Sequence, residues 1–261
     1  MGKYDFKFGD YWVSELGAVS TETPGVEIAQ RNFKLISIPG KDGDDYVDNG
    51  RYENVEFSRS ISFIGRQHFP VKDKIANFIS AFAYLQGYQT FEDTDHEEFV
   101  TEVILTNFKE INKKLRTLHT ATLKFSRKPF WYLKESLIGQ SMDLTATTPS
   151  LTLKNPFMIG SKPKLIFVFA ANQTNVDFTY KVTTGGTSTS YRHHGGVSPY
   201  YYQRYIVDCE EEIARGETSY GNFVSNDDMP KEFSTGQTTV EITAGKSYLS
   251  SVLIAPQWRC L

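Results

Sequence analysis

The sequence has very little cysteine. Only Cys209 and Cys260 occur among its 261 residues, and they form no CxxC pattern and lie far apart in the chain. Such a pair does not indicate a disulfide framework. Free cysteines are usually buried and behave as small apolar side chains. We therefore expect two buried thiols.

Long apolar runs are also missing. The first residues, Met1 to Phe6, carry charges where a signal peptide needs an apolar stretch. No apolar segment approaches the length that spans a bilayer. We therefore expect the chain to be made and to fold in a cytoplasm, with no membrane partner.

No excess of positive charge is present either. The chain has 28 basic and 31 acidic residues and a formal net charge of −3, and neither half of it is a polycation. Because a nucleic-acid groove needs clustered cations, this balance disfavours specific nucleic-acid binding. With 39% hydrophobic and 23% charged residues, the composition is typical of a globular protein.

Short catalytic motifs are absent: there is no phosphate-binding loop, GxSxG, HExxH or GxGxxG. His193 and His194 are adjacent, so on an extended backbone they point to opposite faces and cannot easily chelate one ion. The carboxylates of glycosidases leave no short signature, so a cell-wall hydrolase using Glu97 and Glu102 is an alternative. We nevertheless expect no enzyme, metal site or cofactor, and we interpret residues 210–212 as a charged surface turn.

The chain is rich in aromatic residues and in alternating patterns. It contains 19 Phe, 15 Tyr and 3 Trp, which favour strands and protein interfaces. Residues 55–63 alternate apolar and polar side chains, which predicts a strand with one buried face. Residues 33–40 predict a strand closed by a Pro-Gly turn, and further strands are predicted at 99–108 and 115–125.

One segment has a helical period instead. Apolar residues recur at helical spacing after Pro70, and Gly87 follows the segment. Proline near a helix start and glycine just past its end are the usual punctuation. The pattern predicts one amphipathic helix near 71–86 that covers one face of a sheet.

Two acidic segments interrupt these elements. Residues 41–51 contain Asp-Gly and Asn-Gly pairs, which predict tight hairpin turns. A calcium loop is the alternative, although the spacing and the missing distal Glu do not fit an EF-hand; its ligands would be Asp42, Asp44, Asp45 and Asp48. Residues 91–98 predict a solvated loop between the helix and the next strand, with catalytic carboxylates or metal ligands as the alternative.

A polar, threonine-rich segment predicts a domain boundary at 139–150, between a first domain at 1–138 and a second at 151–261. The second half has no convincing helical period, and its short, regularly spaced strands predict a β-sandwich. These strands are predicted at 164–170, 176–182, 200–208, 238–243 and 247–254. Residues 183–199, with four glycines and many hydroxyls, predict a long mobile loop.

The stretch "SRKPFWY" at 126–132 places three aromatic residues after a proline at the end of a predicted strand. Its cluster, Lys128, Pro129, Phe130, Trp131 and Tyr132, resembles the Pro-aromatic motif that ends the first domain of the distal tail (Dit) proteins of long-tailed, non-contractile bacteriophages. Pro256, Trp258 and Arg259 resemble the terminal Pro-x-Trp-Arg of that family. Asn155-Pro156 and the strand 205–208 lie where similar elements are expected.

The resemblance covers nearly the whole chain and implies a mainly β fold with one helix. The first domain would be a ring-forming β-sandwich or split barrel, and the second a galectin-like β-sandwich. It also implies a homohexameric ring at the virion tail tip, made in the bacterial cytoplasm, with a conduit through which DNA passes without specific binding. The implied partners are other copies of the chain, the tail tube protein, the tail-associated hub protein and a receptor-binding protein.

Neighbouring side chains of a strand alternate faces, so at least one of Phe130, Trp131 and Tyr132 is expected to point away from the first domain's core. We predict that Trp131 or its neighbours pack against the linker, the second domain or an adjoining subunit. The alternatives are that all three pack under their own domain, or that they form an exposed sugar-stacking platform. The strands at 55–63 and 115–125 are candidates to supply edges for pairing between subunits.

The alternative function is a glycan-binding host-adhesion module on the second sandwich. Its contacts would come from Tyr191, Tyr200, Tyr201 and Tyr202, which would stack on sugar rings. Packing of these tyrosines in strands and core is the simpler expectation, because tyrosine favours strands.

Overall fold

The computed structural model describes residues 4–21, 25–65, 71–82, 84–197, 201–219, 221–225 and 227–261. It is mainly β, as the sequence predicts. The chain divides into two compact units, Met1–Trp131 with Leu261, and Tyr132–Cys260. In the described residues, no helix has both the length and the apolar character needed to cross a bilayer.

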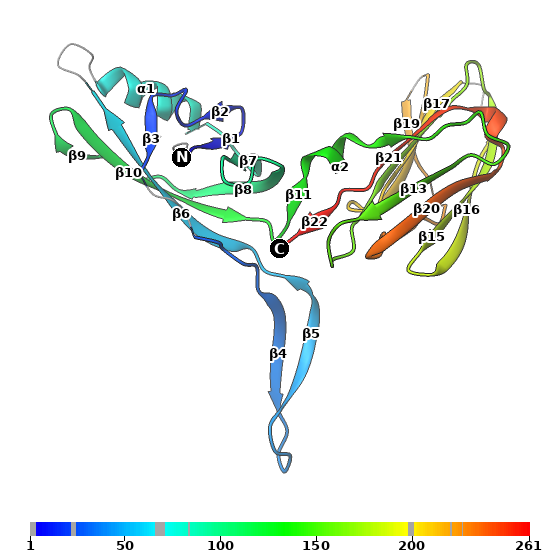
Figure 1. Ribbon diagram of the computed structural model, residues 1–261, viewed down its shortest axis with the longest axis horizontal. Helices are drawn as coiled ribbons and strands as arrows, with labels where there is room; N and C mark the ends of the chain where they lie inside the picture. Colours follow the sequence, from blue (N-terminus) through cyan, green and yellow to red (C-terminus); the bar gives the residue numbers. More distant parts are fainter. Residues whose placement is uncertain are drawn as a thin grey trace. The chain divides into compact units, whose positions relative to one another are not determined.

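The first unit is built on one antiparallel sheet in the order β2-β1-β7-β8-β10-β6-β3, with β9 paired to β10 (Figure 1). Its elements are β1 (Phe6–Phe8), β2 (Tyr11–Trp12), β3 (Ala18–Ser20), β4 (Arg31–Ser37), β5 (Asp44–Tyr52), β6 (Val55–Ile64), α1 (Val71–Phe82), β7 (Gln89–Asp93), β8 (Phe99–Asn107), β9 (Asn112–Leu115) and β10 (Leu118–Arg127).

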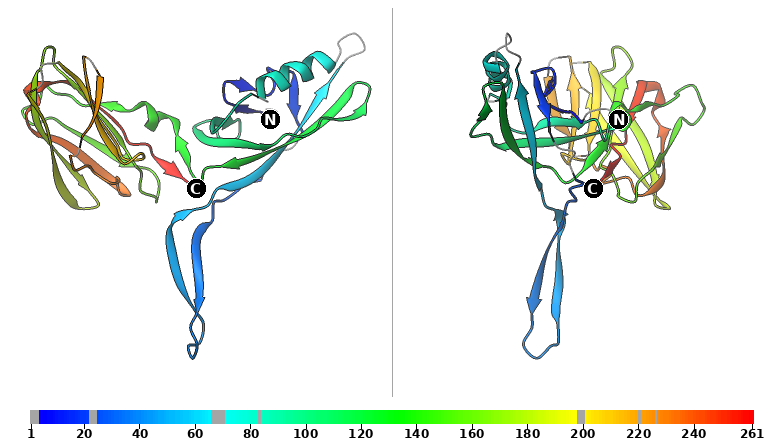
Figure 2. Two further views of the ribbon diagram at one scale, coloured as in Figure 1. Left: turned by 180° about the vertical axis from the view of Figure 1, so that it is seen from behind. Right: turned by 60° about the vertical axis from the view of Figure 1, so that its left-hand side comes forward.

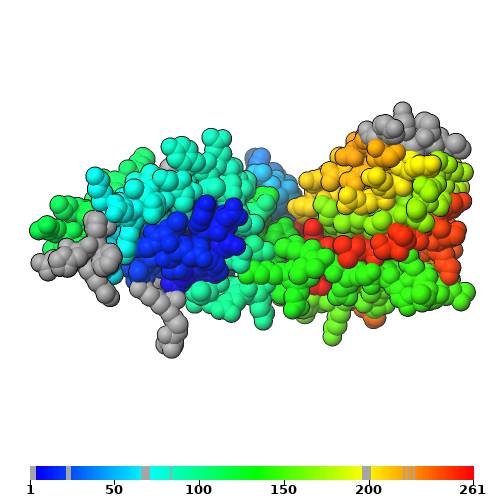
Figure 3. Space-filling model, turned by 90° about the horizontal axis from the view of Figure 1, so that it is seen from above, coloured from blue at the N-terminus to red at the C-terminus, as the bar shows by residue number. Residues whose placement is uncertain are grey.

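The core of the first unit is dominated by phenylalanine. Phe63 of β6 meets Phe78 of α1 edge to face at 5.2 Å, and Phe78 stacks on Phe82 at 4.2 Å. Phe125 of β10 contacts Phe8 of β1 at 5.4 Å. The apolar face of α1 therefore closes one face of the sheet, as predicted, and Figure 3 shows the N-terminal residues beside the helix on that side. The helix, Val71–Phe82, is shorter than the predicted span of 71–86.

The second unit contains two antiparallel sheets that share one core, in the orders β12-β21-β14-β17-β18-β19 and β13-β20-β15-β16. After β11 (Trp131–Leu133), which crosses the boundary between the units, its elements are α2 (Lys134–Ile138), β12 (Gln140–Ser141), β13 (Ser150–Asn155), β14 (Lys164–Phe169), β15 (Asn175–Thr184), β16 (Thr187–Val197), β17 (Tyr202–Asp208), β18 (Ile213–Thr218), β19 (Gly221–Ser225), β20 (Gly236–Ala244), a 3-10 turn (Lys246–Tyr248), β21 (Leu249–Ala255) and β22 (Arg259–Cys260).

The five strands predicted in the second half are confirmed as β14, β15, β17, β20 and β21, with small shifts of their ends. The predicted boundary segment at 139–150 includes β12, which pairs with β21, and Met142, which is buried in the second core.

Tight packing explains why a glycine stands at position 245. A Cβ on Gly245 (φ +75°) would lie 2.2 Å from the Asp177 carbonyl oxygen, so only glycine fits there.

The prediction of a mobile loop at 183–199 is wrong for 183–197, and residues 198 and 199 lie outside the described residues. β15 and β16 form a long hairpin whose turn is Gly185-Gly186, and both glycines have positive φ, 55° and 79°. This is the conformation of a tight hairpin turn that matches the twist of the strands. β16 lies at the edge of its sheet, where hydroxyl-rich and glycine-rich strands are tolerated because one side carries no partner strand.

The two acidic segments are also partly misassigned by the sequence. Residues 44–52 form β5, and Asn49-Gly50 lies at a register shift opposite Asn32 rather than in a turn. Gly50, with φ +72°, provides the positive φ of that bulge. The turn that reverses the hairpin lies at 38–43, and it contains Pro39-Gly40 and Asp42-Gly43, as predicted. In 91–98, the first residues complete β7, whose Phe91 is buried, and the loop begins only after Asp93.

Candidate functional site: the hairpin arm and its base

Within the described residues, no group of three or more His, Cys, Asp or Glu side chains could hold a metal ion. Two of the four aspartates considered as calcium ligands already have basic partners. Asp45 pairs with Lys41, and Asp48 accepts a hydrogen bond from Arg31 Nε at 3.0 Å. The hydrogen bond from Arg31 lowers the pKa of the Asp48 carboxyl. These carboxylates serve the hairpin in which they lie.

The carboxylates of the hydrolase alternative lie on different elements. Glu102 lies on β8 and pairs with Lys128, whereas Glu97 follows β7 in an exposed loop. In the turn at 210–212, Glu210 lies 3.6 Å from Arg259 Nη1 and Glu212 lies 3.9 Å from Lys162 Nζ. Glu210 thus faces a buried arginine, and Glu212 faces a half-buried lysine.

The two histidines of the pair separate as an extended backbone requires. His194 is exposed and lies 3.6 Å from Asp177, whereas His193 points into the second core. His193 Nδ1 lies 2.5 Å from Asp227 Oδ2, and its ring stacks on Tyr205 at 3.8 Å. Burial lowers the pKa of His193 although Asp227 opposes the shift. The pair therefore forms no joint site.

The two thiols differ in burial. Cys209 is buried and donates to the Pro230 carbonyl oxygen at 2.9 Å, and burial raises the pKa of its thiol to about 12. Cys260 is half-buried. A thiol with so high a pKa is a weak nucleophile at neutral pH.

The aromatic motif at 128–132 contacts the first unit. Trp131 lies 6.2 Å from Phe91 and 5.4 Å from His96, ring to ring, and packs on the first core. The Phe130 ring meets Tyr52, at the end of β5, at 5.5 Å. The Lys128 ammonium group lies over the Tyr88 ring at 5.0 Å from its centre.

The Pro129 carbonyl oxygen accepts a hydrogen bond from the Arg127 guanidinium at 3.0 Å. Tyr132, the first residue of the second unit, is half-buried. Packing of this motif against an adjoining subunit stays a prediction.

The terminal motif is fixed inside the second unit. The Pro256 carbonyl oxygen accepts from Ser161 Oγ at 2.6 Å. Trp258 is buried beside Phe233, and Arg259 Nε donates to the Gly160 carbonyl oxygen at 2.8 Å. This motif ties the end of the chain to the segment between β13 and β14.

The tyrosines of the glycan-binding alternative do not form an exposed row. Tyr202 is buried and donates its hydroxyl to the Gly195 carbonyl oxygen. Tyr191 is half-buried and stacks on Tyr180 at 5.3 Å. Tyr201 is 48% exposed, and Tyr200 lies outside the described residues. Among the described tyrosines of this group, one, Tyr201, is accessible to a sugar ring.

Exposed apolar side chains gather on the hairpin of β4 and β5, residues 31–52, which we call the arm. It extends away from the sheet of the first unit (Figures 1 and 2). Register places Leu35 opposite Tyr46, and Phe33 contacts Tyr46 at 5.1 Å, so these three share one face. Ile36 and Val47 lie on the other. All five are exposed, from 41% for Val47 to 60% for Leu35.

The arm is fixed at its base by two buried arginines. Arg59, on the inward face of β6, donates to Glu27 Oε1 at 2.8 Å and to the Tyr4 hydroxyl at 3.1 Å. Arg127, which is 1% exposed, donates to the Glu27 carbonyl oxygen at 3.1 Å and to the carbonyls of Lys128 and Pro129. Burial alone would lower the pKa of Arg59, but the Glu27 carboxylate and Tyr4 more than offset it. Glu27 thus connects the segment before β4 to both core strands.

Comparison with solved structures gives matches along the whole chain. The Dit protein (gp 19.1) of phage SPP1, described as a paradigm of the hub adsorption apparatus in phages that infect Gram-positive bacteria, superposes with a TM-score of 0.64 at 13% identity, over 97% of this chain and 98% of its own. The chain has the Dit fold. No protein-family model matches the sequence, and a search of curated proteins gives no significant match.

The Dit fold is also related to chains of the phage p2 baseplate in its activated conformation. The structures with Sr and with Ca both match with a TM-score of 0.51 at 10% identity, over 97% of this chain. The matched region covers 97% of the p2 chain in the structure with Sr and 96% of the p2 chain in the structure with Ca. The fold inferred from the motifs at 128–132 and 256–259 is therefore confirmed by structures of low sequence identity.

Sequence reasoning missed both parts of this site. The apolar run at 33–38 predicted a strand, but it did not indicate that every residue from Phe33 to Ser37 is exposed. The base did leave a signal: Arg59 occupies the inward phase of the alternation at 55–63, where a charged residue needs a partner. That partner, Glu27, lies on a segment without a periodic pattern.

Proposed function

We propose that this chain is a structural protein of a phage tail tip that assembles with copies of itself into the baseplate hub ring. The observation that carries the proposal is the arm, an uncovered hairpin with apolar side chains on both faces, on a fold shared with baseplate proteins. In this role the ring is a homohexamer. It joins the tail tube protein to the tail-associated hub protein and offers attachment to a receptor-binding protein.

The physical support is that the arm is incomplete as an isolated element. A two-stranded hairpin is marginal in water unless another surface covers it. Unpaired strand edges invite pairing with another chain. An apolar projection on one part of a molecule that fits a different part of its neighbour is a heterologous contact, which forms a ring where the rotation between neighbours closes.

The charge balance suits a conduit. A lumen that binds passing DNA through phosphates would require many cations. The chain carries a net charge of −3 and no polybasic stripe. A ring of such subunits can let DNA pass without holding it.

The test compares the assembly of a variant whose apolar side chains are removed from the arm with that of a variant changed in the second unit. Phe33→Ser combined with Leu35→Ser changes the apolar face of the arm, and Val224→Ser removes a side chain of similar exposure from β19 of the second unit. Light scattering after size exclusion gives the mass, and negative-stain microscopy shows rings.

We expect rings from the wild type and from Val224→Ser, and a monomer with an unchanged melting temperature from the arm variant. A wild type that stays monomeric at every concentration, alone and with tail tube protein, contradicts the proposal. Rings formed as readily by the arm variant would show that the arm does not hold copies together.

A further inference from the structure

The arm and a second apolar surface lie at opposite ends of one strand. β5 ends at Tyr52 and β6 begins at Val55, so β6 continues from the base of the arm. Its other end, Ile64, pairs with Leu118 of β10. Ten residues of strand at about 3.3 Å each separate the two ends by roughly 30 Å.

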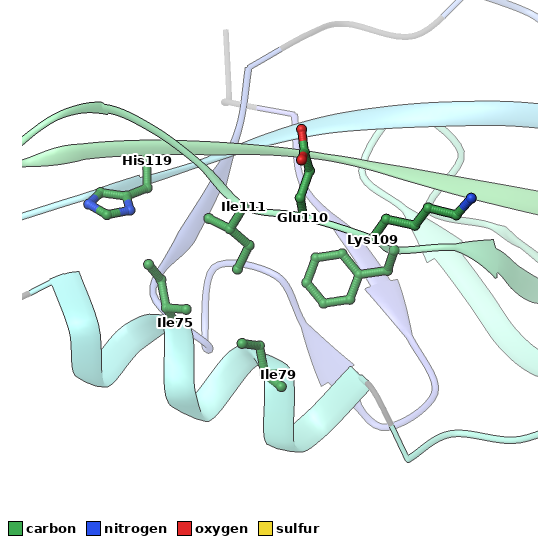
Figure 4. A pocket seen from close by; sticks show the side chains of 7 residues that line it. Ile75, Ile79, Lys109, Glu110, Ile111 and His119 are labelled. Atoms are coloured by element: carbon green, nitrogen blue, oxygen red, sulfur yellow. The ribbon is translucent and has the colours of Figure 1, made fainter.

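At the far end lies a hollow of about 360 Å³ between α1, the segment after β8 and β10. Ile75 and Ile79 of α1 point toward Ile111 across it, and His119 of β10 lies at its side (Figure 4). Phe108 completes the apolar lining. The exposed side chains of Ile64 and Leu115, 51% and 63%, belong to the β6 end and to β9 near this hollow.

The tip of the arm and the rim of the hollow carry opposite charge, while the whole arm is neutral, with four basic and four acidic residues. Around the arm's turn, residues 38–48 hold four aspartates and one lysine, a formal charge of −3. Beside the hollow, residues 109–116 hold three lysines, one arginine and one glutamate, a formal charge of +3. Lys113, Lys114 and Arg116 are exposed and form no ion pair with any described residue, and neither do Asp42 and Asp44.

We propose that this hollow is the receptor for the arm of a second copy of the chain. The inference rests on the proposed function and names the surface that the arm occupies in the ring. The apolar side chains Phe33, Leu35 and Tyr46 cover the hollow, and Asp42 and Asp44 face Lys113 and Lys114 at its rim.

Geometry selects a second copy over the chain's own arm. The two surfaces lie at opposite ends of β6, a strand paired along its whole length with β10, and the arm extends away from the hollow (Figure 1). A chain therefore cannot bend its arm into its own hollow. Each copy offers one arm and one hollow, which is the arrangement of a head-to-tail ring.

Zero-length cross-linking tests the contact directly. A carbodiimide joins a carboxylate to an amine only where the two touch. An equal mixture of unlabelled and 15N-labelled chains distinguishes links between copies from links within one copy. We expect mixed-isotope links from Asp42 or Asp44 to Lys113 or Lys114. Oligomers that give no such link would overturn this receptor.

Charge exchange provides a second, functional test. Lys113→Glu with Lys114→Glu reverses the rim, and Asp42→Lys with Asp44→Lys reverses the arm. Because complementary charges speed and orient association, each variant alone should assemble at least about tenfold less tightly than wild type. A one-to-one mixture of the two should restore assembly, since each arm then meets a rim of opposite charge. Lys154→Glu, on an exposed lysine of β13, is the control and should assemble like wild type.

The outcomes separate the two proposals. A wild type that forms no oligomer and no inter-chain link overturns both the proposed function and this receptor. A wild type that assembles, with both charge variants behaving like Lys154→Glu, overturns the receptor and leaves the ring intact. Loss in the single variants without recovery in the mixture also overturns the pairing of these two surfaces.

Discussion

Arg59, Arg127 and His193 are among the most deeply buried side chains of the described residues, with exposures of 4%, 1% and 1%. Burying a charge is costly unless it is paired or hydrogen-bonded. The two arginines satisfy this condition through Glu27 and backbone carbonyls. His193 satisfies it only in part, because its Nε2 has no hydrogen-bond partner among the described residues.

This half-satisfied histidine predicts a pH dependence of stability in the second unit. Burial lowers the pKa of folded His193, with Asp227 and Asp177 opposing the shift and His194 adding to it. The unfolded chain therefore binds a proton more readily, so stability falls as pH drops below the unfolded value of about 6.5. The slope from one proton is at most about 1.4 kcal/mol per pH unit.

Thermal melting between pH 7.5 and pH 5 measures this effect. His193→Asn removes the titrating group and keeps an N–H that can reach Asp227, so its melting curves should depend less on pH. His194→Asn, on the exposed neighbour, should behave like wild type. Equal slopes for His193→Asn and wild type would mean that other groups cause the acid sensitivity.

At the scale of elements, the arm depends on contacts outside its own strands. Within the arm, exposed pairs such as Arg31 with Asp48 contribute little to stability. Its direction is set at the base, where Glu27 meets Arg59 and Arg127 and where the Glu53 N–H donates to the Gln30 carbonyl oxygen. An element that must reach a partner gains from being held in one orientation before binding.

Glu27→Gln should therefore loosen the arm. The change keeps the shape of the side chain but leaves the buried Arg59 without its carboxylate, at a cost of about 1–3 kcal/mol in the free energy of unfolding. Hydrogen exchange should become faster for amides of residues 25–36. Glu53→Gln, on an exposed glutamate at the same base, should leave exchange nearly unchanged. If exchange at the base is the same in Glu27→Gln and wild type, this ion pair does not hold the arm.

At the scale of the whole molecule, each unit has its own core. One consists of residues before Trp131 together with Trp131 itself, and the other lies entirely after Tyr132. A unit with a core of its own can fold alone and unfold cooperatively. We expect a fragment spanning 132–261 to show near-ultraviolet circular dichroism and a single sharp thermal transition. A fragment that melts without cooperativity would show that its sandwich needs the first unit.

The elements that the sequence predicted well are those whose side chains meet a core. Residues 55–63 alternate because one face of β6 is buried, and 71–82 have a helical period because α1 packs on the sheet. The hairpin residues 183–197 were mistaken for a loop because β16 is an edge strand, and a strand with one unpaired side can keep the composition of a loop. Local composition does not reveal whether hydroxyl-rich residues pair with a neighbour.

The sequence by itself determined the mainly β fold, the position of the helix and the resemblance to phage Dit proteins, because periodicity and short motifs are local properties of the chain. Only the tertiary structure decided that an apolar strand is exposed in the arm, that Glu27 meets Arg59 and Arg127, and that the arm and the hollow adjoin opposite ends of β6. These are distances between residues far apart in sequence, and strand pairing and packing set them.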